Sequence, residues 1–139
     1  RDGEDRRRVL RHIADRAGWG FQTIERSTGL TAALSDIDKG GAVLLDSVTA
    51  ALSEAMFGPE FDANAAATVT AELLAVSRDP AHFVCVCDDL WRGGEDYPDW
   101  TEVYVRGLAH VCRALAAEFD VVCDMAAGLP HVWKGAWPL

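Results

Sequence analysis

Two near-continuous apolar runs, each followed by acidic residues, constrain the fold of this chain more than any other feature. The first lies in "GGAVLLDSVTA" and ends in Asp46, and the second lies in "DPAHFVCVCDD" and ends in Asp88 and Asp89. Each has the length and composition of a strand in a parallel sheet that is covered on both faces. Helical stretches at residues 49–57 and 63–76 separate them. Strands that alternate with helices predict a doubly wound, mostly parallel α/β sheet.

Further elements extend this pattern toward both ends of the chain. Residues 4–17 have helical periodicity, residues 20–25 read as a short strand, and residues 28–37 carry a threonine start signal before a short helix. A long amphipathic helix is expected from about residue 99 to residue 118. The stretch "FDVVCDMAAGLP" then closes the pattern with one more buried strand and a turn.

Length and charge exclude several classes of protein. A chain of 139 residues, half of them apolar, buries one core of ordinary size, so we predict a single domain over residues 1–139. The formal charge of −9 argues against nucleic acid as a partner, because a phosphate-tracking surface needs an excess of Lys and Arg. No apolar stretch reaches the length of a membrane span, and the charged opening does not resemble a signal peptide. We therefore expect a cytoplasmic protein.

Four cysteines, three of them in apolar strand-like runs, are expected to be reduced, buried thiols. A Cys-x-Cys pair without a second pair of ligands is not a zinc signature. These cysteines are Cys85, Cys87, Cys112 and Cys123.

The acids that follow the two apolar runs form the first candidate site. Ligands of open α/β sheets bind at the carboxyl ends of the strands, where Asp46, Asp88 and Asp89 are predicted to lie. A carboxylate fixed at a strand tip suits a magnesium ion that bridges phosphates. Asp is also common at strand ends because it suits turns and helix starts, and the pattern alone favours that plainer role for Asp46. The usual companion, a G-x-x-x-x-G-K-[ST] phosphate loop, does not occur in these residues.

His12 is the second candidate. It lies away from the apolar face of the first helix, with Arg8 and Arg16 one turn before and after it. Neutral imidazole is a competent nucleophile near neutral pH, and flanking guanidinium groups suit the phosphates that it would attack. Spacing alone nevertheless favours a solvated helix face with an incidental histidine.

Several segments, read in order, resemble one family. They are "RVLRHIADRAGWGFQTIE", "AVLLDSVTAALSEAMF", "FVCVCDD" and "RALAAEFDVVCDMAAGLPHVWKG". Together they are similar to the bifunctional adenosylcobinamide kinase and adenosylcobinamide-phosphate guanylyltransferase of cobalamin biosynthesis. The resemblance implies a P-loop NTPase (RecA-like) three-layer fold with a mostly parallel sheet. In the family a first strand and a phosphate loop precede the histidine helix, and this chain starts after them.

The resemblance also implies roles for individual residues. His12 matches the histidine that accepts GMP from GTP, and Glu25 matches a nucleotide-binding glutamate at the end of a Thr-x-Glu strand. Asp46 matches an acid that contacts nucleotide or magnesium. The residues that follow His12 match a segment that contacts the guanine nucleotide, namely Ile13, Ala14, Asp15 and Arg16.

The implied activity has two halves, which phosphorylate adenosylcobinamide from ATP or GTP and then transfer GMP through a histidine phosphoramidate. The implied cofactor is Mg²⁺, the partners are adenosylcobinamide, its phosphate and GTP, and the implied assembly is a homo-oligomer. The chain departs from the family at "CDDLWRGGEDYPDW", and Cys112 and Arg113 replace an Asn-Gln pair. Two alternatives remain open. One is a non-catalytic nucleotide- or corrinoid-binding relative, or a subunit whose partner supplies the phosphate loop; the other is a small-molecule kinase that does not use His12.

Overall fold

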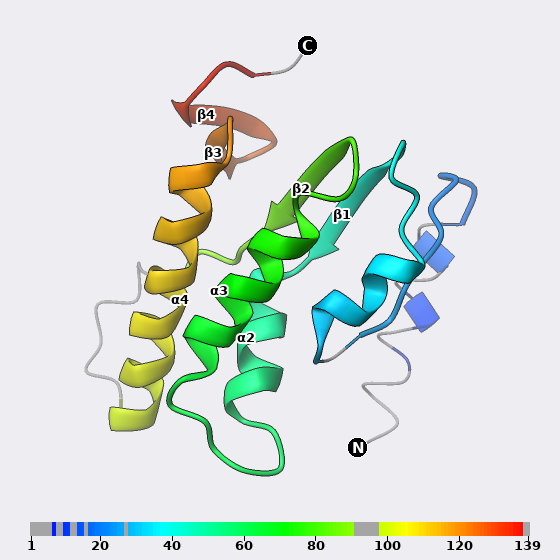
Figure 1. Cartoon of the computed structure of the whole chain (residues 1–139). Helices are drawn as coiled ribbons and strands as arrows, with labels where there is room; N and C mark the ends of the chain where they lie inside the picture. Colours follow the sequence, from blue (N-terminus) through cyan, green and yellow to red (C-terminus); the bar gives the residue numbers. More distant parts are fainter. Residues whose placement is uncertain are drawn as a thin grey trace.

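A computed structural model of the protein describes residues 7, 10, 11, 14, 15, 17–26, 28–90 and 98–137. Its centre is a parallel pair of strands, β1 (Ala42–Asp46) and β2 (His82–Val86). Three helices, α2 (Val48–Met56), α3 (Ala65–Val76) and α4 (Asp99–Glu118), pack on one another beside this pair (Figure 1). The α/β character, the parallel pairing and the approximate positions of these five elements agree with the sequence pattern.

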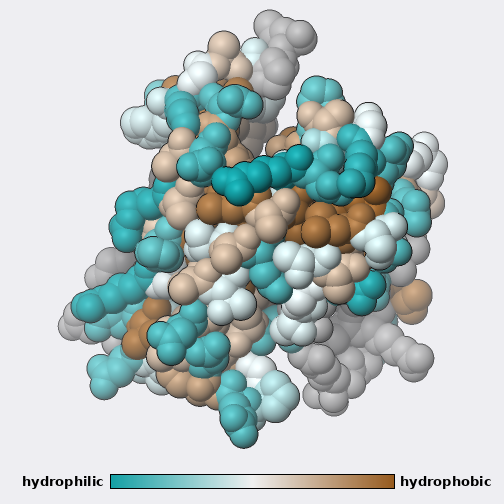
Figure 2. All heavy atoms as spheres, in the orientation of Figure 1, coloured by the Kyte–Doolittle hydropathy of each residue, from teal (hydrophilic) through white to brown (hydrophobic). Residues whose placement is uncertain are grey.

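The hydrophobic core lies between the helices and one face of the β1–β2 pair. On that face Leu45, Phe83 and Cys85 are partly buried against the core. Hydrophilic residues cover much of the outer surface of the helices, and hydrophobic residues come to the surface between them (Figure 2). The fully buried part of the core comes mostly from the three helices, with side chains such as Val48, Leu52, Met56, Val69, Leu73, Leu108 and Val111.

The opposite face of the pair is exposed, which corrects the prediction of a sheet covered on both faces. Leu44, Val84 and Val86 are 46%, 55% and 43% exposed. Side chains of a strand alternate between its faces, and α2, α3 and α4 lie on one side of these two strands. A continuous apolar run therefore does not by itself show that other elements pack on both faces of the strand.

The last predicted strand exists but does not join β1 and β2. Strand β3 (Val122–Ala126) pairs antiparallel with β4 (Leu129–Lys134) in a separate sheet. Ala127 and Gly128, which connect them, have φ of 51° and 78°. Positive φ at both central residues is the geometry of a tight hairpin turn. The chain therefore folds back at once, and β4 provides hydrogen-bond partners for the backbone groups of β3. Most of the hairpin is exposed, contrary to the predicted buried strand.

The amino-terminal part departs further from the prediction. Residues 7, 10, 11, 14 and 15 of the predicted first helix are helical and Ala17 lies in a turn, but Leu10, Ala14 and Ala17 on the apolar side are exposed. The strand predicted at residues 20–25 is wrong: residues 21–26 have no regular secondary structure, and in the described structure no neighbouring strand pairs with them. A strand needs such a partner for its backbone groups.

The predicted helix at residues 28–37 is a 3₁₀ helix, η1 (Leu30–Ser35). Gly29, with φ of 65°, stands at its start, and no side chain caps it, so the threonine start signal is wrong. The Leu30 N–H instead donates to Glu72 Oε2 of α3 at 3.2 Å. None of the helices in the described part of the chain combines the length and apolar character needed to span a bilayer.

Candidate functional site

The carboxyl ends of β1 and β2 lie at the same edge of the sheet. Asp46 is the residue opposite Val86 in the register of the pair, and Asp88 and Asp89 follow directly after the second strand. All three carboxylates belong to exposed residues. The structure thus brings together the three strand-end acids at the edge where the sequence predicts them.

Helix α2 begins at this edge. A cis peptide bond joins Asp46 to Ser47, and Ser47 Oγ accepts a hydrogen bond from the Ala50 N–H at 3.1 Å. Ser47 is therefore the N-cap of the helix, and its hydroxyl satisfies one of the amides that lack a partner within the helix. The chain turns from strand to helix immediately after Asp46, so the turn sets the position of that carboxylate.

Thr49 links the elements behind the edge. It is 8% exposed, and its Oγ1 accepts a hydrogen bond from the Asp88 N–H at 3.0 Å. Its carbonyl oxygen accepts one from the Tyr104 hydroxyl of α4 at 2.9 Å. One buried threonine thus holds the first residues after β2 and the start of the long helix in a defined relation. Sequence analysis missed this role, although a threonine three positions after a strand-end acid was the available signal.

Two cysteine sulfurs meet beside Thr49. The Cys112 thiol of α4 donates to Cys87 Sγ at 3.5 Å. This donor, with a second hydrogen bond from the Thr49 side chain, lowers the pKa of Cys87 to about 7, against the opposing effects of burial, Asp88 and Asp89. The same contact and burial raise the pKa of Cys112, because the shared proton stays with its thiol. All four cysteines are free thiols, as predicted, but each is partly rather than fully buried.

Burial also raises two neighbouring pKa values. Desolvation, with a smaller contribution from the charge on Cys87, raises the pKa of Cys85 to about 11. Desolvation raises the pKa of Tyr104 to about 12, and the negative charges of Cys87 and Asp88 add to that shift. Tyr104 therefore remains a neutral hydroxyl, and a hydrogen-bond donor to Thr49, throughout the physiological range.

The carboxylates at this edge of the sheet would fit a magnesium ion only together with a bound phosphate-containing ligand. Mg²⁺ is commonly held by one or two carboxylates plus substrate phosphates and water, and Asp46 provides an exposed carboxylate of this kind. Within the described residues there is no group of three or more His, Cys, Asp or Glu side chains that would hold a metal ion by themselves. An Mg²⁺ ion held by Asp46 would therefore need further oxygen ligands from a bound phosphate and water.

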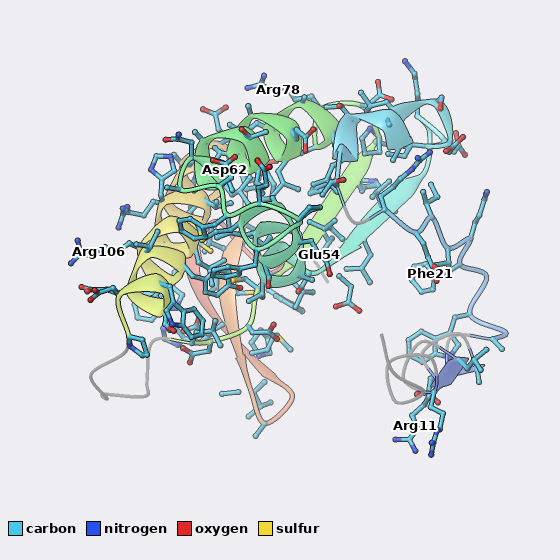
Figure 3. The ribbon with its side chains drawn as sticks, turned by 90° about the horizontal axis from the view of Figure 1, so that it is seen from below. Arg11, Phe21, Glu54, Asp62, Arg78 and Arg106 are labelled. Carbon is cyan, nitrogen blue, oxygen red and sulfur yellow. The ribbon has the colours of Figure 1, made fainter. Side chains whose placement is uncertain are left out.

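The amino-terminal candidates are less completely placed. His12, Ile13 and Arg16 lie outside the described residues, so their predicted roles stay predictions. Ala14, Asp15 and Glu25 are exposed. Arg11, directly before His12, and Phe21 lie on the side of the molecule nearer β1 than α4 (Figures 1 and 3).

The fold and the strand-end acids define an α/β protein with a candidate ligand site at the carboxyl edge of its parallel strands. A protein-family model described as cobinamide kinase / cobinamide phosphate guanyltransferase matches residues 1–132. The chain belongs to this family, whose members act as kinase and guanyltransferase on cobinamide in cobalamin biosynthesis. A search of curated proteins finds no match.

Proposed function

We propose that this protein phosphorylates adenosylcobinamide and transfers GMP to the product, with His12 as the nucleophile and a P-loop NTPase (RecA-like) fold. The family match over residues 1–132 carries the proposal. The common edge formed by Asp46 and the Asp88–Asp89 pair supports it, because phosphate-handling α/β proteins bind their ligands at such edges.

In the transferase half, the neutral imidazole of His12 attacks the α-phosphorus of GTP. A nitrogen–phosphorus bond forms as the bond to pyrophosphate breaks, which leaves GMP on the histidine. An oxygen of the cobinamide phosphate then attacks the same phosphorus and releases the imidazole. Arg16 would hold phosphate oxygens, since a guanidinium group pairs with them in a bidentate manner. Ile13, Ala14, Asp15 and Glu25 would contact the guanine nucleotide.

Asp46 is the residue proposed to hold Mg²⁺. When bound with the nucleotide, the ion neutralises charge on the phosphates that leave. Ser47 and the start of α2 keep the carboxylate at the edge of the sheet. Replacing Asp46 with Asn should raise the Mg²⁺ concentration needed for reaction and slow adduct formation roughly tenfold or more.

Labelling with GTP tests the transferase half. Native full-length protein incubated with α-labelled GTP and Mg²⁺ should form an acid-labile, base-stable adduct, as a phosphoramidate does. His12→Ala should abolish the adduct, and His110→Ala, which changes an exposed histidine of α4, should leave it unchanged. An adduct that persists in His12→Ala would remove the assignment of the nucleophile.

One observation supports a second candidate function, in which the protein is a non-catalytic binding relative or a subunit that depends on a partner. The kinase half needs a phosphate loop, and the G-x-x-x-x-G-K-[ST] motif does not occur in these 139 residues. Saturable GTP binding without an adduct or a phosphorylated product in the full-length protein would favour that candidate. Phosphorylated cobinamide without an adduct would instead favour a kinase that does not use His12.

The expected homo-oligomer is tested by the mass of the native particle in light scattering.

A further inference from the structure

Cys87 and Cys112 form a pair of thiols that the activity described above does not use. Cys87 is the first residue after β2, and Cys112 lies in the middle of α4. Their sulfurs are 3.5 Å apart and in hydrogen-bond contact. Both residues are partly buried against the core, so two well-packed elements hold the sulfurs together. A disulfide needs these atoms to approach to about 2.05 Å, a short movement for two side chains.

The two thiols have different chemical characters. Hydrogen bonds from Cys112 and Thr49 stabilise the thiolate of Cys87 and hold its pKa near 7, although Asp88, Asp89 and burial oppose them. A thiolate is the form of cysteine that attacks peroxides, and partial exposure lets a small oxidant approach. Cys112 keeps its proton, and its thiol is in hydrogen-bond contact with the Cys87 sulfur that would be oxidised. This arrangement pairs a nucleophilic thiol with a resolving one.

The other cysteines lack this arrangement. Cys85 lies on β2, where burial raises the pKa of its thiol to about 11. Cys123 belongs to the separate β3–β4 hairpin. Of the four thiols, only Cys87 and Cys112 are in sulfur-to-sulfur hydrogen-bond contact within the described structure. The pairing is therefore a property of the tertiary fold and not of the local Cys-x-Cys sequence.

We propose that Cys87 and Cys112 are an oxidisable dithiol, which a hydroperoxide converts into an intramolecular disulfide between β2 and α4. The Cys87 thiolate attacks a peroxide oxygen, the O–O bond breaks, and a sulfenic acid and hydroxide form. The Cys112 thiol then attacks the sulfenic sulfur, its proton joins the leaving hydroxyl group, and water is released. With the proton that Cys87 first lost, two thiols and one hydrogen peroxide give one disulfide and two waters. The two sulfurs lose the two electrons that the peroxide gains.

This oxidation would act directly at the edge of the sheet. Cys87 precedes Asp88, whose backbone N–H is held by Thr49. A disulfide would remove the thiolate that the Thr49 side chain and the Cys112 thiol now contact. It would also join the end of β2 covalently to α4, so the segment that leaves the sheet at Asp88 would be tied to the long helix. Disulfides of cytoplasmic proteins are typically transient and redox-sensing, which is the class of modification proposed here.

Peptide mapping after oxidation tests the proposal independently of any enzymatic activity. The full chain is treated with a slight excess of hydrogen peroxide, remaining thiols are alkylated, and the digest is analysed by mass spectrometry. The expected product is a cross-linked peptide pair containing Cys87 and Cys112, which dithiothreitol separates. Peroxide that leaves both thiols free, or converts Cys87 to sulfinic acid without a cross-link, would overturn the proposal. A cross-link that uses Cys85 or Cys123 in place of either residue would overturn it as well.

Two variants separate the roles of the thiols. Cys112→Ser should leave the sulfenic acid of Cys87 unresolved, so that dimedone traps it in the variant and not in the wild type. Cys123→Ser is the matched control and should give the same disulfide as the wild type. Far-ultraviolet circular dichroism checks that each variant folds. The peptide map of the oxidised wild-type protein tests the disulfide without any variant. Equal dimedone labelling of the wild type and Cys112→Ser would contradict the resolving role.

Discussion

The two strand pairs of this protein have similar apolar sequences but opposite relations to the core. In the β1–β2 pair, alternate residues such as Leu45 and Phe83 pack against the core. In the β3–β4 hairpin, Leu129 and Trp133 are 71% and 68% exposed. The pair buried on one face is parallel and the exposed one is antiparallel. An apolar run therefore indicates a strand, but not how deeply that strand is buried.

The connections explain the difference. Parallel strands need a long crossover, and here α2 and α3 provide it and cover the strands that they connect. The hairpin closes on Ala127 and Gly128, so its pairing needs no other element. We expect the β1–β2 pair to unfold only with the helical core, and the hairpin to open at a lower free energy. The following changes test this contrast, from the largest expected effect to the smallest.

Truncating a leucine in each region should give the largest difference. Leu108 of α4 is fully buried, and Leu108→Ala should lower the free energy of unfolding by about 2–5 kcal/mol, because it removes apolar contacts and leaves a cavity. The matched change Leu129→Ala, at a residue 71% exposed, should cost less than about 0.5 kcal/mol. Urea unfolding followed by circular dichroism measures both. Equal losses would show that the hairpin belongs to the same core.

Glycine substitutions test the hairpin itself. A Cβ at Gly135 would clash with the Asp120 carbonyl oxygen, and the residue has φ of 76°. Gly135→Ala should therefore cost the roughly 1–2 kcal/mol of a left-handed conformation plus about 1–3 kcal/mol to displace backbone. Gly128 has φ of 78°, and among the described residues nothing beyond its chain neighbours lies within 4 Å of an added Cβ, so Gly128→Ala should cost only the first amount. Amide exchange in β3 and β4 measures the loss. Equal exchange in the two variants would contradict the steric argument.

The hydroxyl of Thr49 should contribute the next largest effect. Thr49→Val keeps the shape of the side chain but leaves the Asp88 N–H without its acceptor, at an expected cost of about 1–3 kcal/mol. Faster exchange of the Asp88 amide should accompany that loss. Thr70→Val is the control, because the Thr70 hydroxyl donates to the Ala66 carbonyl oxygen within the same helix, α3. A loss for Thr49→Val no greater than for the control would show that this anchor does not hold the edge.

The thiols of the β1–β2 region should differ in their pH dependence. The rate of alkylation of Cys87 should be half-maximal near pH 7 and should fall about tenfold per pH unit below it, because only the thiolate reacts. Cys85, whose pKa burial raises to about 11, should remain unreactive over the same range. Alkylation followed by mass spectrometry from about pH 5 to about pH 9, roughly two units on either side of the pKa of Cys87, gives both profiles. Parallel profiles would contradict the proposed stabilisation of the Cys87 thiolate.

The smallest effect is expected where the hairpin meets the helix. Lys134 Nζ donates to the carbonyl oxygens of Ala116 and Ala117 at 2.9 Å, in the last turn of α4. Lys134→Met should cost about 0.3–1 kcal/mol, because a cation at a helix C-terminus stabilises the helix dipole. Arg26→Met, which removes an exposed ion pair with Asp36, is the control. A loss confined to hairpin exchange would show that Lys134 anchors the hairpin without stabilising α4.

Much of the fold was predictable from local patterns. The positions of β1 and β2 follow from the apolar runs, the bounds of α4 follow from helical spacing, and the acids after the two strands indicate the sheet edge. The strand predicted at residues 20–25 failed because a strand requires a partner that a local pattern does not contain. The site is predicted at Asp46 from the strand ends and at His12 by resemblance, and the role of His12 stays a prediction.

The sequence by itself determined the order of strands and helices, the acids at the strand ends and the membership of the family. Tertiary structure decided that one face of β1–β2 is exposed, that β3 pairs with β4, and that Cys87 meets Cys112. The Thr49–Asp88 hydrogen bond and the Cys87–Cys112 contact join residues 39 and 25 positions apart. Periodicity reports only neighbours along the chain, whereas such contacts depend on how the helices pack against the strands.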